Sequence, residues 1–346
     1  MPDAERHCVG AAPTRVDKCG VGNPGNRRAL QHSEEAIVLN RLAVISVLLA
    51  TIVFLAPIYW IASTAFKPRN LSTTVPPTIV FTPEVSPFVK LFTKRAQLRN
   101  PPTPEEYAAA PWWERMVFDG GEKVVRDGKG NVQWSGYPSR FMNSLIVATI
   151  STLLAVGMGT LTAYGFSRFR VKGEGDWLFF ILSTRMLPPV VVAIPMFLMY
   201  RAVGLVDTHI GLIILYTAFN LSFSVWLMKG FIDEIPREYE EAALVDGYTR
   251  MQVFIKIVLP EAATGIAATA VFCFIAAWNE YAFALMMTNR RAQTAPPFIP
   301  AQLGSGLTDW TTIAAGTVLF LLPVAIFTFL LRRHLLRGVT FGAIRK

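Results

Sequence analysis

The sequence predicts an all-α polytopic membrane protein with six transmembrane helices and a long loop between the first and second helices. Of its 346 residues, 52% are hydrophobic and 16% are charged, and the mean hydropathy is +0.39. This composition is typical of chains that cross a membrane repeatedly, and it disfavours a soluble globular domain. The apolar residues also gather in six runs, each long enough to cross a hydrocarbon core, which takes roughly 20 residues.

The first apolar run, 42–66, follows a polar N-terminal segment. Residues 1–41 are rich in glycine, proline, asparagine and charge and show no periodic apolar face, so we expect a disordered tail. So long a polar leader is unlike a cleaved signal peptide. We therefore predict a first transmembrane helix at 42–66.

The other runs define a membrane core at 143–331 and a C-terminal tail at 332–346. Its transmembrane helices are expected at 143–166, 177–200, 210–231, 265–288 and 310–331. Both termini lie on one side of the membrane if all six runs cross it. Placing that side in the cytoplasm gives the inner segments 18 lysines and arginines, against three in the two short outer loops. Lysine and arginine are enriched in the cytoplasmic loops of membrane proteins, so this distribution predicts cytoplasmic termini. The 11 basic residues of the loop 67–142 do not contradict it, because this charge bias applies to short loops and not to long ones.

Several other classes of function are disfavoured by the sequence. The formal charge of +9 does not indicate nucleic acid, because the basic residues lie scattered at the edges of apolar runs. Cys8, Cys19 and Cys273 have no CxxC spacing, so we predict neither a metal site nor a disulfide framework. The four histidines are dispersed, and no catalytic residue follows from their spacing. No GxxxxGK[ST] phosphate loop occurs, so we expect that this chain does not bind ATP itself. We expect no other cofactor in it.

The third run contains residues that are unusual in a membrane span. Arg185 lies within it, just before Pro188 and Pro189. A charge in hydrocarbon is costly, and prolines free backbone carbonyls, so such residues are tolerated where a helix faces protein or a watery cavity.

The polar stretch from Pro236 to Pro260, within the loop 232–262, predicts two short helices joined by a tight bend. Pro236 suits a first helical turn, Glu238 and Glu240 complement the helix dipole, and Gly247 can take the left-handed conformation that ends a helix. In the second helix, Thr249 and Gln252 have capping-box spacing, and Pro260 is expected to end the run. Its predicted apolar face consists of Met251, Phe254, Ile255 and Val258.

This hairpin resembles the EAA loop of permease subunits in bacterial binding-protein-dependent ABC importers. The resemblance rests on Glu241-Ala242-Ala243, on Gly247, on Ile257 and on Leu259-Pro260. The alternative is an ordinary cytosolic hairpin between membrane spans. In the family the loop inserts into a groove of the ATP-hydrolysing subunit. The resemblance implies this coupling role for Tyr239, Glu241, Ala242, Ala243, Leu244, Asp246, Gly247, Ile257, Leu259 and Pro260.

Other stretches are similar to the carbohydrate-uptake, maltose-type branch of these permeases, which has the MetI-like fold. They are Lys67-Pro68, 81–92, 141–145, 184–189, 204–208 and 219–221. Residues of about 93–137 then look like an insertion in the outer loop. Within it, 124–132 predicts a β-hairpin. The tryptophans Trp112, Trp113 and Trp134 either pack a small cap or lie at the lipid interface.

The fifth run contains Trp278-Asn279-Glu280-Tyr281, which resembles a run of sugar-type permeases. A carboxylate there needs water or a partner. Counted along straight helices, Glu280 lies roughly 22 Å and Arg185 roughly 12 Å above the cytoplasmic side, so we do not expect a direct ion pair. Two roles stay open: a solute path formed by Arg185, Asn220, Trp278, Asn279, Glu280 and Tyr281, or gating and helix contacts.

The resemblance implies half of a translocation pathway for a sugar, sugar alcohol or related solute in the bacterial inner membrane, switching by alternating access. The implied partners are a second, nonidentical permease, two ATP-binding subunits that hold ATP and Mg, a periplasmic or lipid-anchored solute-binding protein, and membrane lipid. One alternative is an ion-coupled secondary transporter in which Arg185 and Glu280 couple ion and solute. Another is a membrane-embedded enzyme, which would need clustered nucleophiles or metal ligands in the outer insertion.

Overall fold

The computed structural model describes residues 24–301 and 309–341. The chain divides into two units, 1–59 and 60–346, each described by itself. Most of helix α1, Pro24–Thr64, belongs to the first unit. The segment expected to be a disordered tail is therefore helical from Pro24, while residues 1–23 lie outside the described residues.

A polar lobe, residues 67–136, connects α1 to α5. Its strands β1 (Arg95–Gln97) and β2 (Glu122–Val124) pair antiparallel. Its helices are η1 (Arg69–Leu71), α2 (Ser86–Phe92), α3 (Pro104–Ala109) and α4 (Trp112–Asp119). The predicted hairpin at 124–132 forms around a bridge between Arg126 and Val132, with the N–H groups of Asp127 and Gln133 donating to the carbonyls of Asn131 and Val125 at 2.8 and 2.9 Å. The β1–β2 pairing was not predicted.

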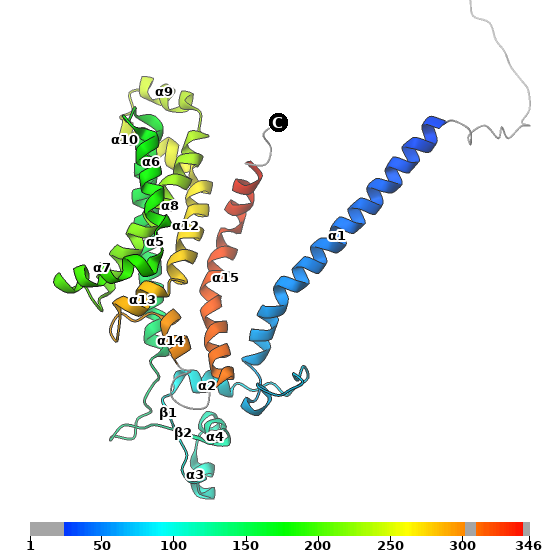
Figure 1. Ribbon diagram of the computed structural model, residues 1–346, viewed down its shortest axis with the longest axis vertical. Helices are drawn as coiled ribbons and strands as arrows, with labels where there is room; N and C mark the ends of the chain where they lie inside the picture. The colour runs from blue at the N-terminus through cyan, green and yellow to red at the C-terminus, as the bar shows by residue number, and fades with distance from the viewer. Residues whose placement is uncertain (1–23, 302–308, 342–346) are drawn as a thin grey trace, which may run out of the picture. The chain divides into compact units, whose positions relative to one another are not determined.

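Four long helices form the bundle of the second unit (Figure 1). They are α5 (Tyr137–Arg168), α8 (His209–Asp233), α12 (Ala263–Trp278) and α15 (Trp310–Phe341). α5 packs along α8, and α12 packs against α5, α8 and α15. At Gly159 a Cβ atom would lie 2.2 Å from Ser224 Oγ, so only glycine permits this approach of α5 to α8.

Among the described residues, four helices are long and apolar enough to cross a membrane: α1 from Arg41, α5, α8 and α15 to Arg332. Two further pairs of helices meet that standard only if each bent pair counts as one span, which gives up to six. The apolar runs at 177–200 and 265–288, each expected as one helix, are both interrupted.

The first interruption follows from the paired prolines. α6 (Glu174–Ser183) continues into a 3₁₀ turn, η2 (Thr184–Met186), and α7 (Pro189–Ala202) departs at 92°. Figure 1 shows α7 turning out of the direction of α6. Pro188 precedes Pro189, which disfavours helical conformation at Pro188.

Two breaks bound α12 (Ala263–Trp278), and the second of them interrupts the run 265–288. α10 (Arg250–Val253), a π-helical turn η3 (Phe254–Val258) and α11 (Leu259–Glu261) meet α12 at 73°. The helical run that begins at Arg250 ends at Glu261, one residue after Pro260, which agrees with the expectation that Pro260 ends it. Beyond α12 the chain breaks and resumes as α13 (Ala282–Met287) and α14 (Ala295–Ala301).

Candidate functional site

The structure confirms the helical hairpin predicted at Pro236–Pro260. α9 spans Arg237–Val245, and Gly247 follows with φ +87°, a left-handed conformation that glycine adopts without strain. The backbone N–H of Thr249 donates to Gln252 Oε1 at 2.8 Å and that of Gln252 donates to Thr249 Oγ1 at 3.4 Å, which forms the predicted capping box. In Figure 1, α9 and α10 lie at the upper end of the bundle and the lobe lies at the lower end.

Glu240 fixes the hairpin to the bundle. Its side chain lies against Arg168 and Tyr164 of α5, and only 6% of the residue is exposed. The Arg168 Nε–H donates to Glu240 Oε1, and the Tyr164 hydroxyl donates to Oε2 at 3.0 Å. The sequence suggested only a dipole role for Glu240, and nothing in its spacing indicated that it, and not Glu241, is the buried carboxylate.

Arg168 also ties α8 to this anchor. Its Nη2 donates to the carbonyl oxygens of Ile232 at 3.0 Å and Ile235 at 2.9 Å, at the end of α8. Arg237 at the start of α9 donates to the carbonyl of Ser167 at 2.8 Å. A displacement of α9 would therefore also displace the ends of α5 and α8.

The opposite side of the hairpin is exposed. Of the ten residues predicted to couple, those exposed are Tyr239, Glu241, Ala242, Asp246, Gly247 and Pro260; Leu244, Ile257 and Leu259 are half-buried, and Ala243 is buried. Val245 at 88% exposure, Met251 and Ile255 add apolar surface that we did not predict. The expected apolar face of the second helix is thus divided, because only Phe254 and Val258 of its four residues are buried.

A second polar site lies at the break between α6 and α7. Arg185 from η2 donates from Nη1 to the Phe219 carbonyl at 3.2 Å and to Asn220 Oδ1 at 3.4 Å, both on α8. Asn220 in turn donates from Nδ2 to the Cys273 carbonyl on α12 at 3.4 Å. The prolines that interrupt the span therefore allow one arginine to link the broken helix with two bundle helices.

Glu280 lines the same cavity, whose volume is about 190 Å³. It accepts a hydrogen bond from the Tyr216 hydroxyl at 2.9 Å and from the backbone N–H groups of Phe283 and Ala284, each at 3.0 Å, at the start of α13. Arg185 and Glu280 share this cavity, and no ion pair joins them among the described residues. Its other lining residues are Pro189, Tyr216, Phe219, Asn220, Ala276, Ala277 and Phe283.

The other members of the Trp278–Tyr281 run lie elsewhere. Trp278 is 1% exposed, packs between Phe274 and Phe320, and donates from Nε1 to the Phe320 carbonyl at 3.1 Å. Asn279 and Tyr281 are exposed and do not line the cavity. Tyr216, which was not predicted, completes the polar wall. No sequence pattern predicted that Tyr216 lies beside Glu280; only the folded structure brings them together.

The structure bears on the other sequence predictions. Within the described residues no group of three or more histidine, cysteine, aspartate or glutamate side chains could hold a metal ion. Cys273 is buried, and Cys8 and Cys19 lie outside the described residues. Trp112 and Trp134 are largely exposed, while the small core of the lobe contains Val117 and Val124.

Comparisons with known proteins agree with this architecture. A family model described as "Binding-protein-dependent transport system inner membrane component" matches residues 141–341, from α5 through α15. The chain is 29% identical over 293 residues to a probable ABC transporter permease protein, y4oR, of Sinorhizobium fredii, covering 85% of this chain and 91% of that protein. It is 35% identical over 212 residues to the trehalose transport system permease protein SugB of Mycobacterium tuberculosis, covering 60% and 77% of the two chains.

One solved structure shares the fold over most of the chain. It is a bacterial ABC transporter involved in the import of the acidic polysaccharide alginate, with a TM-score of 0.58 and 19% identity. The match covers 91% of this chain and 99% of that one.

Proposed function

The chain belongs to the family of binding-protein-dependent transport system inner membrane components, the permease subunits of ABC importers, and we propose that it forms half of a pathway for a sugar, sugar alcohol or related solute. As a member of this family it is a multi-pass inner membrane protein. The relative SugB, named for trehalose transport, supports a polyhydroxylated solute. The cavity at Arg185 and Glu280 supports it too, because a mostly apolar wall with a few polar groups suits a sugar, whose ring has apolar faces and whose hydroxyl groups need hydrogen-bond partners.

The α9–α10 hairpin couples this chain to an ATPase on the cytoplasmic side. The observation that carries this proposal is its two-sided construction: one side is anchored through buried Glu240 and the other exposes Tyr239, Ala242 and Val245. An exposed apolar surface of this kind suits a protein partner. ATP and Mg would bind two such partner subunits, and a second, nonidentical permease and a solute-binding protein would complete the importer.

Alternating access would run through the same contacts. Closure of the ATP-bound partners moves α9, and the Glu240–Arg168 anchor transmits that movement to α5 and α8. α8 carries Tyr216 and Asn220 of the cavity, so its displacement would alter the solute path. Such a switch requires that ATP bind the two arrangements of the importer with different affinity.

Reconstitution of the purified importer in vesicles tests this proposal. Gly247→Asp should abolish solute-stimulated ATP hydrolysis and uptake, because it adds a charge and a side chain at φ +87°. Gly130→Asp, in the lobe, is the matched control, since Gly130 has φ +82° and open space around it, and it should leave both activities intact. Unchanged coupling in Gly247→Asp, or purification without an ATPase, would contradict the proposal.

The same vesicles separate this function from ion-coupled transport. Uptake should require ATP inside the compartment that holds the ATPase and should persist when a protonophore and a sodium ionophore dissipate ion gradients. Glu280→Gln should reduce uptake without abolishing basal ATP hydrolysis, because Glu280 lies in the cavity and not in the hairpin. Uptake driven by a gradient without ATP would favour the secondary transporter.

A further inference from the structure

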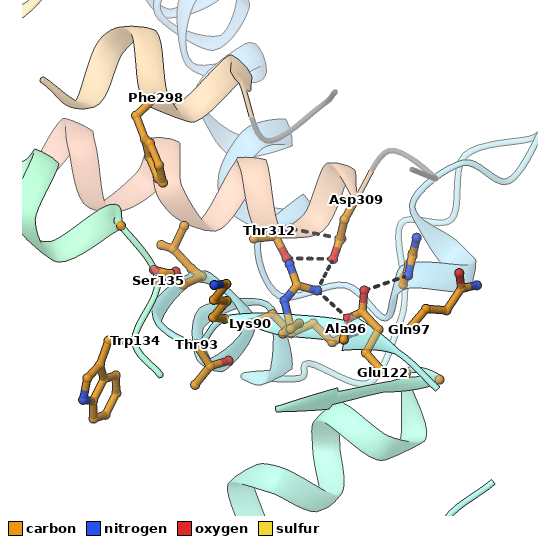
Figure 2. Close-up of a pocket in the computed structure, with 17 residues that line it drawn as sticks. Lys90, Thr93, Ala96, Gln97, Glu122, Trp134, Ser135, Phe298, Asp309 and Thr312 are labelled. Atoms are coloured by element: carbon orange, nitrogen blue, oxygen red, sulfur yellow. Dashed lines mark hydrogen bonds and ion pairs between the residues drawn. The ribbon is translucent and has the colours of Figure 1, made fainter. Parts of the chain in front are cut away.

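The lobe contains a polar cavity that the proposed pathway does not use. Its volume is about 700 Å³, within the range of small-molecule sites. α2, β1 and β2 form one side, and Phe298 of α14 and Thr312 of α15 form the other (Figure 2). It lies at the end of the second unit opposite the α9–α10 hairpin (Figure 1).

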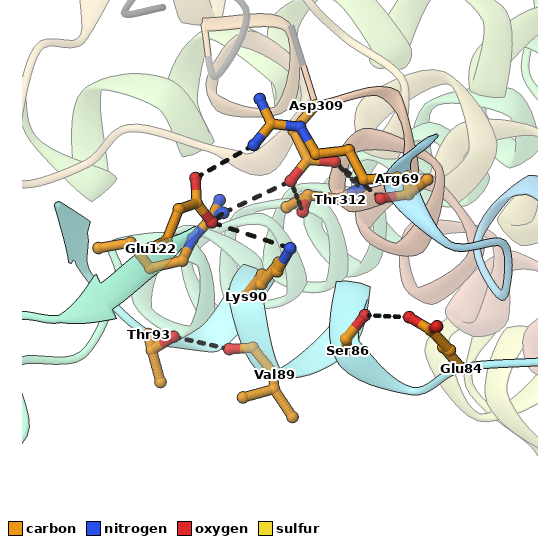
Figure 3. Close-up of polar contacts among 11 residues, drawn as sticks. Arg69, Glu84, Ser86, Val89, Lys90, Thr93, Glu122, Asp309 and Thr312 are labelled. Atoms are coloured by element: carbon orange, nitrogen blue, oxygen red, sulfur yellow. Dashed lines mark hydrogen bonds and ion pairs between the residues drawn. The ribbon is translucent and has the colours of Figure 1, made fainter. Parts of the chain in front are cut away.

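The cavity is positively charged. Four basic side chains line it, and they face two carboxylates, Glu122 and Asp309; the four are Arg69, Lys90, Lys94 and Arg95. Figure 3 shows Glu122 beside Arg69 and Lys90, whose nitrogens lie 3.6 and 3.9 Å from its carboxylate. Arg95 pairs with both Glu122 and Asp309. Basic residues therefore outnumber acidic ones in the lining, so the cavity favours an anion.

Lys90 is the best placed of these cations to bind a ligand. The residue is 4% exposed, and its Nζ lies 3.9 Å from Glu122 Oε2, beyond hydrogen-bond distance. A buried ammonium gains from every hydrogen bond that it can donate. Burial is the main cause that lowers the pKa of Lys90, and the nearby Asp309 and Glu122 oppose it. A ligand carboxylate would add to that opposing effect.

The wall near Lys90 also offers an aromatic surface. Trp134 is 70% exposed and lines the cavity beside Ser135 and Thr93 (Figure 2). An exposed tryptophan ring buries large apolar area at little entropic cost, and the C–H face of a pyranose is a complementary flat surface. Lys94 and Gln97 supply further hydrogen-bonding groups for hydroxyls.

We propose that this cavity binds an acidic sugar, a pyranose bearing a carboxylate, with Lys90 and Lys94 facing the carboxylate and Trp134 packing on the ring. The inference rests on the proposed function and deepens it, since it names a solute class and a binding site separate from the cavity at Arg185. Such a site would hold solute on the lobe side before it enters the membrane part.

Binding measurements on the purified importer test this site directly. Isothermal titration with sodium D-glucuronate should show binding, while D-glucose should bind roughly tenfold more weakly because it lacks the charged hydrogen-bond acceptor. Acetate, which carries the charge without the ring, should be weaker still. Lys94→Gln and Trp134→Ala, two exposed positions, should each weaken glucuronate binding by roughly tenfold.

Lys90→Met should weaken binding further, and Lys123→Met is the matched control, since Lys123 lies on β2 but does not line this cavity. Equal binding of acetate and glucuronate would indicate an adventitious ion only and would overturn the sugar proposal. Glucuronate binding that survives both Lys94→Gln and Trp134→Ala would place the site elsewhere. An importer that couples ATP hydrolysis to uptake but binds no glucuronate would overturn this inference alone, whereas loss of the ATPase partner with glucuronate binding retained would overturn only the proposed function.

Discussion

Two adjacent glutamates in α9 have opposite environments. Glu240 is buried against Arg168 and Tyr164, while Glu241 is exposed. The family pattern draws attention to Glu241, but the contacts give Glu240 the anchoring role. The family pattern identifies the stretch that meets a partner, but it does not identify which side chain faces the bundle. The nine residues of α9 form both the side that packs on the bundle and the side that is exposed.

This difference gives a first prediction. Glu240→Ala should destabilise the protein by about 3 kcal/mol, because it leaves the buried Arg168 side chain without its carboxylate. Glu241→Ala is the matched control and should change stability by less than about 0.5 kcal/mol. Thermal unfolding of both variants in detergent measures the difference. Equal melting temperatures would show that the ion pair does not hold the hairpin.

Asp207 forms a comparable anchor at the other end of the bundle. It lies between α7 and α8 with φ +56°. Its carboxylate accepts hydrogen bonds from four consecutive backbone N–H groups, those of Asn289, Arg290, Arg291 and Ala292, at 3.1–3.2 Å. This arrangement connects the α7–α8 loop to the turn before α14.

The Asp207 anchor predicts a pH dependence. Burial alone would raise the pKa of Asp207, but the backbone N–H groups outweigh it and the pKa is lowered. A carboxyl group with a lowered pKa contributes stability that is fully present above its unfolded value, about 3.9, and is lost as the pH falls through the folded-state pKa. Asp207→Asn keeps a residue that tolerates positive φ but removes the charge.

We therefore expect Asp207→Asn to unfold at a lower temperature than the parent at pH 7, and the two melting temperatures to converge below about pH 4. Asp246→Asn, at an exposed position of the hairpin, should show no such convergence because it should differ little at either pH. A constant difference between parent and Asp207→Asn across the pH range would mean that the carboxylate charge is not what stabilises the turn.

At the scale of elements, the positions of helices could be predicted and the geometry of their breaks could not. The predicted runs 143–166, 210–231 and 310–331 fall within α5, α8 and α15, although α5 begins six residues earlier and α15 ends ten residues later than predicted. Hydropathy joined α6 to α7 and carried α12 past Trp278. The hydropathy of a run does not report backbone geometry: Pro188 and Pro189 marked the place of the break between α6 and α7, but not its 92° angle.

The capping box of α10 is the local signal that performed best. Thr249 and Gln252 were predicted from their spacing alone, and both hydrogen bonds form. Thr249→Ala should therefore lower the free energy of unfolding by about 1 kcal/mol. Its effect on the coupling of ATP hydrolysis to uptake should be larger than its effect on stability, because α10 directly follows the bend at Gly247. Thr82→Ala, an exposed threonine of the lobe, is the control. Thermal unfolding and ATPase assays on both variants separate the two effects.

At the scale of the whole second unit, the hairpin end and the lobe end are joined by the bundle. The lobe is more than an appended insertion, because Arg95 of β1 donates to Asp309 at 3.4 Å and Leu91 of α2 packs in a cluster with Ile299 of α14. The sequence marked residues of about 93–137 as an insertion from the similarity of the flanking stretches. It could not show that Arg95, the partner of Glu122, would also reach Asp309 just before α15, since that contact joins residues more than two hundred positions apart.

The lobe therefore has one part that attaches it to α15 and another part, with Val117, that completes its own small core. β1 and β2 hold the charged cluster, whereas α3 and α4 lie beyond the point where the Leu98 N–H donates to the Gly121 carbonyl at 3.0 Å. Because those two residues are adjacent, replacing 99–120 with Asn-Gly should close a two-residue hairpin without disturbing the cluster. We expect the shortened protein to melt at a lower temperature than the parent, because the replacement removes the buried Val117 and the Glu114–Arg126 ion pair, and to retain ATP-driven uptake.

Glu122→Ala should loosen the attachment of the lobe to α15, although it changes a single side chain. It removes the carboxylate shared by Lys90 and Arg95 and leaves their charges facing one another, at a cost of about 2 kcal/mol. Limited proteolysis should then cut the lobe of Glu122→Ala faster than the lobe of the shortened protein. If the shortened protein unfolds while Glu122→Ala remains as stable as the parent, then α3 and α4, and not the charged cluster, attach the lobe to α15.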